Sequence, residues 1–182
     1  MRRPFPVIDV RPLDPPGVSA FGMRRRHLGD IPAPGDGAVL VFLVDGRYQQ
    51  LPGGRNPRPT DHVVVAARAV CVVDMRPRSM LFDLPIASPR ADRDLHLRLG
   101  IRCRVVDPCI VAQQGLRDVA PELLTYFTED QRLRWTAAGL ADRTVNEVFR
   151  VVSNRVAARF VAHPLTVPGM EFRLAEIRLS TR

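Results

Sequence analysis

The clearest pattern of apolar and polar positions in the chain lies between residues 95 and 105. Apolar side chains occupy every second position there: Leu95, Leu97, Leu99, Ile101, Cys103 and Val105. The positions between them hold His96, Arg98, Gly100, Arg102 and Arg104. Because successive side chains of a strand point to opposite sides, this pattern predicts a β-strand with one buried apolar face and one solvated basic face.

A hairpin is predicted earlier in the chain. Ala38–Val44 is continuously apolar, and Asp45-Gly46, a dipeptide typical of two-residue turns, separates it from Arg47–Leu51. We therefore expect a buried strand paired with a shorter, more exposed one. The Pro- and Gly-rich stretch that follows has no phosphate-binding glycine motif and is expected to be a loop.

Three further segments have strand-like patterns. His62–Met75 is rich in Val and predicts a strand, and Leu81–Ala87 predicts a short one in which Pro85 marks an edge or a bend. The alternation that begins at Met170 changes phase near Ala175–Glu176, which predicts a closing strand with a bulge.

Helices are expected between the long strand and the closing strand. Asp107 and Pro108 are typical of a helix start, and Gly115 of its end. Pro121 can open a second helix that runs through Leu133 and Trp135 toward Gly139. The adjacent Glu129 and Asp130 are interpreted as the acidic first turn of a helix.

A third helix begins at a capping box in which Thr144 and Glu147 are three residues apart. Its apolar stripe is expected to cover the sheet through Val145, Phe149, Val152, Val156 and Phe160. Strands followed by clustered helices and a closing strand predict an α+β domain, with an antiparallel or mixed sheet and helices packed on one face.

Residues 1–36 differ from the rest of the chain, because they hold seven of its 17 prolines. They predict an extended Pro- and Arg-rich N-terminal arm that lies along a sheet edge, followed by one domain over residues 37–182. No apolar run approaches the ~20 residues of a membrane-spanning helix, and no signal peptide is evident. We therefore expect a cytoplasmic protein.

Charge adds an interaction hypothesis. All 27 basic residues are Arg and the net charge is +8, yet the only basic run is Arg24, Arg25 and Arg26, which are candidate arm contacts. The candidate basic interaction face is the solvated side of the strand predicted over residues 95–105. It consists of His96, Arg98, Arg102 and Arg104. Aromatic residues make up only 6% and do not interleave with these arginines, so nucleic acid is not the expected partner.

The sequence contains few of the residue patterns that are typical of catalytic or metal-binding sites. The three cysteines form no CxxC pair, and the four histidines have no metal-ligand spacing. No catalytic, cofactor-binding or metal-binding residue is therefore assigned, and an enzyme is not expected. Cys71 and Cys103 are interpreted as buried thiols. Cys109 lies at a helix start, where thiol pKa values are lowered, but a structural role is favoured.

Several short segments of the sequence occur in the same order as in a known family. They are Val41–Arg47 with Leu51-Pro52-Gly53, Val73–Arg76, Ser88–Asp92 leading into Leu95–Pro108, and Pro168–Phe172 followed by Ala175–Ile177. Over about residues 37–180 the chain resembles the SPFH or band 7 domain of stomatins, prohibitins and flotillins. The resemblance implies a non-enzymatic scaffold without cofactor, whose partner is itself or a related SPFH protein, with peripheral contact at the inner face of a membrane.

The chain differs from most members of that family in two ways. It shows neither their N-terminal hydrophobic segment nor their C-terminal coiled coil, so a bare domain is expected. Association is expected through the arm, the outer sheet face and the edge strand near Leu81–Ala87. The alternative function is an Arg-rich module that binds an anion, either nucleic acid or acidic lipid.

Overall fold

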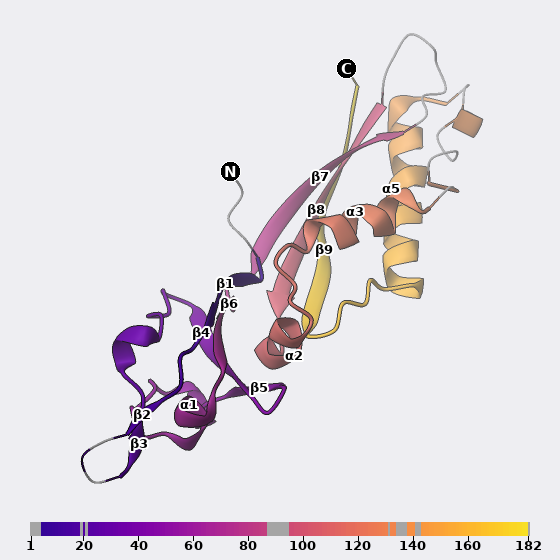
Figure 1. Cartoon of the computed structure of the whole chain (residues 1–182). Helices are drawn as coiled ribbons and strands as arrows, with labels where there is room; N and C mark the ends of the chain where they lie inside the picture. Colours follow the sequence, from indigo (N-terminus) through magenta and orange to yellow (C-terminus); the bar gives the residue numbers. More distant parts are fainter. Residues whose placement is uncertain are drawn as a thin grey trace. The chain divides into compact units, whose positions relative to one another are not determined.

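The computed structural model describes residues 5–18, 20, 22–86, 95–130, 132–133, 138–140 and 143–181. The chain divides into two compact units (Figure 1). The first comprises Met1–Arg76, Val105–Val119 and Pro168–Met170, and the second comprises Pro77–Arg104, Ala120–Val167 and Glu171–Arg182. Each unit contains strands and helices, so the expected α+β class is confirmed.

The first unit contains a four-stranded antiparallel sheet. Its strands, in spatial order, are β1 (Val7–Pro12), β6 (Ala69–Asp74), β4 (Ala38–Val44) and β5 (Arg47–Gln50). Strands β2 (Gly17–Val18) and β3 (Arg24–Arg25) form a separate pair. Asp45 and Gly46 both have positive φ, at 50° and 78°, as the type I′ turn of the predicted hairpin requires.

Both faces of this sheet are covered. Phe42 and Val70 pack on one side with Leu13 and Ile31 from the N-terminal segment. On the other side Val41, Cys71 and Val73 are fully buried, and helix α2 (Pro108–Gln113) packs against β4, β5 and β6. Burial on both faces explains why the segments that form β4 and β6 are continuously apolar.

The predicted position of the N-terminal segment along a sheet edge is confirmed. β1 pairs with β6 at the edge of the four-stranded sheet, with Val10 opposite Cys71. Leu13 and Ile31, farther along the same segment, are buried in the core of the first unit. The first 36 residues therefore contribute a strand and core side chains to this unit.

The single strand predicted over His62–Met75 is wrong in its first part. His62–Ala66 forms helix α1, and β6 begins only at Ala69. The reason is a tertiary contact: Arg26 donates to the carbonyls of Val64 and Ala67, at 2.9 and 2.7 Å. This contact satisfies backbone acceptors that a strand would otherwise pair with a neighbour, and local propensity cannot reveal it.

The start and end of α2 agree with the prediction. The carboxylate of Asp107 accepts hydrogen bonds from the N–H groups of Cys109 and Ile110, at 2.9 and 3.1 Å. Gly115 follows the helix with φ of 63°. Gly169 lies so close to this helix start that an added Cβ would be 2.7 Å from the carbonyl oxygen of Asp107. Only glycine fits there.

The second unit contains a three-stranded sheet in the order β7 (Arg78–Ile86), β8 (Leu95–Val105) and β9 (Met170–Thr181). All six apolar residues predicted to face inward on β8 are buried, whereas Arg98, Arg102 and Arg104 are exposed. β7 pairs antiparallel with β8, extends farther at its start than the predicted strand, and holds Pro85 at an exposed position. Ala87 and the acidic stretch before β8 lie outside the described residues.

Helices α3 (Ala120–Thr128) and α5 (Val145–Ala162) lie on the same side of this sheet (Figure 1). The rings of Phe82 on β7 and Phe127 on α3 are 6.5 Å apart, so this is the side that the inward leucines of β8 face. Three short 3₁₀ helices complete the described elements: Leu28–Asp30, Pro52–Gly54 and Ala138–Leu140.

Two helix predictions need correction. The second helix ends at Thr128, because Asp130 accepts a hydrogen bond from the N–H of Leu133 and caps a new helical segment; Trp135 lies outside the described residues. The capping box of α5 is confirmed, but Val145 and Phe149 are exposed. The buried stripe of α5 consists of Val148, Val152 and Val156.

Candidate functional site

The candidate basic face lies on the side of the three-stranded sheet that faces away from α3 and α5. Arg98, Arg102 and Arg104 project from β8 on this side because the alternate positions are turned inward, and His96 is half-buried. We call this side of the β7–β8–β9 sheet the outer face. The strand register brings residues of β7 and β9 beside the arginines.

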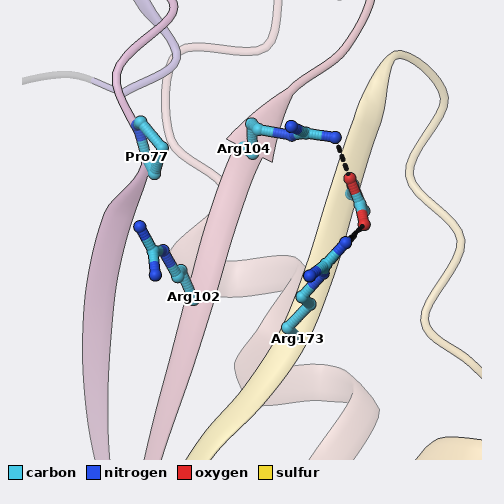
Figure 2. A pocket seen from close by; sticks show the side chains of 5 residues that line it. Pro77, Arg102, Arg104 and Arg173 are labelled. Carbon is cyan, nitrogen blue, oxygen red and sulfur yellow. Dashed lines mark hydrogen bonds and ion pairs between the residues drawn. The ribbon is translucent and has the colours of Figure 1, made fainter.

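At one end of the outer face is a cavity of about 220 Å³, shown in Figure 2. It is lined by Pro77, Arg102, Arg104, Glu171 and Arg173. Two of these arginines come from β8 and the third from β9. The described lining therefore has an excess of two positive charges.

Glu171 organises two of the three guanidinium groups. Its carboxylate accepts a hydrogen bond from Arg104 Nη2 at 2.5 Å and others from Nη2 and Nε of Arg173 at 2.9 and 3.0 Å. Hydrogen bonds from Arg173 and then Arg104 hold the pKa of Glu171 below its usual range. The carboxylate is thus ionised and fixes both arginines at the cavity wall.

Arg102 differs from Arg104 and Arg173 in its contacts. Its guanidinium forms no hydrogen bond or ion pair with any described residue, and it is directed toward Pro77 in Figure 2. Its N–H donors therefore remain available to a ligand.

The remaining predicted residues of the face lie elsewhere on β8. Arg98 pairs with Asp83 of β7 at 3.0 Å, and His96 lies opposite Pro85. Between them and the cavity is Gly100, where an added Cβ would be 3.0 Å from Cβ of Glu176. The structure thus separates the four predicted residues, because only Arg102 and Arg104 reach the cavity.

Sequence reasoning missed Glu171 and Arg173. They lie 67 and 71 positions beyond Arg104 and Arg102, and only the pairing of β9 with β8 brings them to the same face. The available signal was the alternation that begins at Met170, which places Glu171 and Arg173 on one side of their strand. The exposed positions of β9 then change from residues 173 and 175 to residues 178 and 180, as the predicted phase change requires.

The candidate arm contacts do not form one surface. Arg24 and Arg25 are exposed in β3, but Arg26 is only 2% exposed. Its guanidinium donates to the carbonyls of Asp14, Val64, Val65 and Ala67. Burial lowers its pKa. Arg26 is therefore a structural residue, and its assignment as a partner contact is wrong.

A second polar cluster, which sequence reasoning also missed, surrounds Asp130. This carboxylate is buried and pairs with Arg155 at 3.3 Å and Arg159 at 3.1 Å, both from α5. Burial alone would raise the pKa of Asp130, but hydrogen bonds from Leu133 N–H, Arg159 and Arg155 outweigh it and lower the pKa. Arg159 also lies over the ring of Tyr126. The cluster fastens α5 to the segment after α3.

The three cysteines are not activated nucleophiles. Burial raises the pKa of Cys71 and that of Cys103 to about 12. The position of Cys109 at a helix start predicts a lowered thiol pKa, but burial and the neighbouring carboxylate of Asp107 raise the pKa of this thiol. A raised pKa disfavours the thiolate, which is the form that a nucleophilic cysteine requires.

The comparisons with known proteins do not identify the chain. No model of a protein family matches it, and no match is found among curated proteins. Within the described residues, no helix has the length and apolar character needed to cross a membrane, and no group of three His, Cys, Asp or Glu side chains is placed to hold a metal ion.

Proposed function

We propose that this chain is a non-enzymatic assembly module of the SPFH or band 7 type, which acts by association with a second copy of itself or with a related chain. The observation that carries the proposal is the edge of the three-stranded sheet, where β7 pairs only with β8 among the described residues. Outward N–H and C=O groups of an edge strand can pair with a strand of another chain.

The order of elements supports the SPFH part of the proposal. The alternating strand β8 is followed by Asp107 and Pro108, by helices, and by the closing strand β9, which is the order that the resemblance implies. Peripheral docking to a membrane is part of this proposal.

The sequence of β7 favours pairing with a second copy. Leu81 is 54% exposed and lies next to the middle residue of this strand. Pro77 and Pro85 lie four positions before and after it, and neither has an N–H group to donate. A ladder between two β7 strands is thus bounded at both ends and centred on Leu81. Antiparallel pairing about a two-fold axis would bring the two Leu81 side chains together.

Sedimentation velocity over a range of protein concentrations tests the proposal. Leu81→Asp should weaken self-association by about tenfold or more, because it removes an apolar contact and places two carboxylates opposite each other. The matched control is Val161→Asp, which introduces the same charge at a position on α5 that is 82% exposed. A chain that is monomeric at every concentration, or association weakened equally by both variants, would contradict the proposal.

A further inference from the structure

The cavity at the end of the outer face carries an inference that does not depend on self-association. Three guanidinium groups and one carboxylate line a space of about 220 Å³. An isolated surface arginine is an ordinary solvated side chain. Here Arg102, Arg104 and Arg173, from two strands, instead line the same cavity, so their fields add there.

Two of the three cations are already held in position. Glu171 binds both Arg104 and Arg173, so these long side chains lose part of their rotational freedom before any ligand arrives. Such preorganisation reduces the entropy cost of binding. Because Glu171 neutralises only one of the three charges, it orders the site without cancelling its positive potential.

We propose that this cavity binds a phosphate monoester group, with Arg102 as the principal ligand and Arg104 and Arg173 as the flanking cations. Arg102 supplies unused N–H donors in the planar fork that matches phosphate oxygens. Above its second pKa, near 6, a phosphate monoester carries two negative charges, which equal the charge excess of the lining. A carboxylate carries one charge and leaves the second positive charge uncompensated.

The size of the cavity suits a small phosphate ester. Its volume corresponds to about seven water molecules at liquid density, which leaves room for a phosphate group and part of the alcohol it esterifies. The same chemistry occurs in soluble phosphate esters and in lipids with a terminal phosphate. The experiment distinguishes these two sources.

Isothermal titration calorimetry provides the test, with inorganic phosphate, glycerol phosphate and acetate as probes at matched ionic strength. The phosphate probes should bind and acetate should not. Arg102→Ala should weaken phosphate binding by about tenfold or more, since it removes charge-assisted hydrogen bonds. Arg102→Lys should retain only part of the affinity, because the fork is lost while the charge remains.

Arg98→Ala is the matched control, because it removes the same charge from the same face of the same strand. Arg98 is four residues from Arg102, or about 13 Å along the strand, which exceeds the Debye length of about 8 Å at physiological salt. Its substitution should change the affinity by less than about twofold. Thermal unfolding of each variant confirms that the fold is retained.

The source of the ligand is tested with phosphatidylcholine vesicles prepared with and without phosphatidic acid. Binding only to vesicles with phosphatidic acid, lost in Arg102→Ala, would support a lipid ligand, whereas glycerol phosphate binding without vesicle binding would support a soluble ester. The proposal is overturned if neither phosphate probe binds, if acetate binds equally well, or if Arg98→Ala and Arg102→Ala weaken binding by the same factor.

Discussion

In the four-stranded sheet, neighbouring residues of the central strand β4, such as Val41 and Phe42, are both buried. The reason is that the N-terminal segment packs on one face of this sheet and helix α2 on the other. In the three-stranded sheet, the apolar residues at alternate positions of β8 are buried, and of the residues between them only Gly100 is, so Leu97 is fully enclosed while Arg98 next to it is exposed. A sheet covered on both sides has few side chains left for a partner. The sheet covered on one side keeps a polar face and an edge, and both of our proposals concern that sheet.

The largest expected effect tests the covered sheet. Phe42→Ala should lower the free energy of unfolding by about 3–5 kcal/mol, because it leaves a cavity in the core. Val41→Ala, on the opposite face, should also cost more than the ~0.5 kcal/mol that surface positions tolerate. Urea denaturation measures both variants. A negligible effect at either position would show that one face of this sheet is not covered.

Alanine substitutions at two neighbouring positions of β8 should change the free energy of unfolding by unequal amounts. Leu97→Ala should lower the free energy of unfolding by about 2–5 kcal/mol. Arg98→Ala should change it by less than about 0.5 kcal/mol, because its pair with Asp83 is exposed to solvent. Equal losses at the two positions would mean that both faces of β8 are covered, and the contrast between the sheets would disappear.

A smaller effect is expected where the helical layer of the second unit is fastened. Asp130→Asn should cost about 1–3 kcal/mol, less than a fully buried ion pair, because Arg155 and Arg159 are 37% and 20% exposed. Urea denaturation at neutral pH measures the difference between this variant and the parent chain.

The effect of Asp130 should depend on pH. Because its pKa is lowered in the folded chain, its contribution is fully present above the ordinary carboxyl value of 3.8 and is lost as the pH falls through the lower folded value. The stability difference between the parent chain and Asp130→Asn should therefore narrow in acid. A difference that stays constant or widens would contradict the assigned ionisation of Asp130.

The elements that could be predicted from sequence are those set by local pattern. The alternation along β8, the capping box at Thr144 and the helix start at Asp107 each depend on residues close together in the chain, and all three are confirmed. Helix α1 depends instead on hydrogen bonds from Arg26, which is far from it in the sequence. Propensity alone carries no information about such contacts.

In the candidate site, too, the residues set by local pattern could be predicted and those that depend on strand pairing could not. Arg102 and Arg104 could be assigned to one exposed face because they alternate with apolar residues on one strand. The cavity also requires Glu171 and Arg173, and only the register between β8 and β9 places them beside those arginines. Likewise, charge alone indicates Arg24–Arg26 as candidate arm contacts, whereas the burial of Arg26 excludes this residue from such a contact surface.

The most direct test of whether the exposed edge of the three-stranded sheet is the assembly surface is an amide NMR spectrum of the chain, recorded at a series of dilutions. We predict that the shifts that change with concentration are those of Arg78–Ile86, the β7 strand, with the largest changes near Leu81. Concentration-dependent shifts confined to β4 and β6 of the four-stranded sheet, with β7 unchanged, would contradict this assignment.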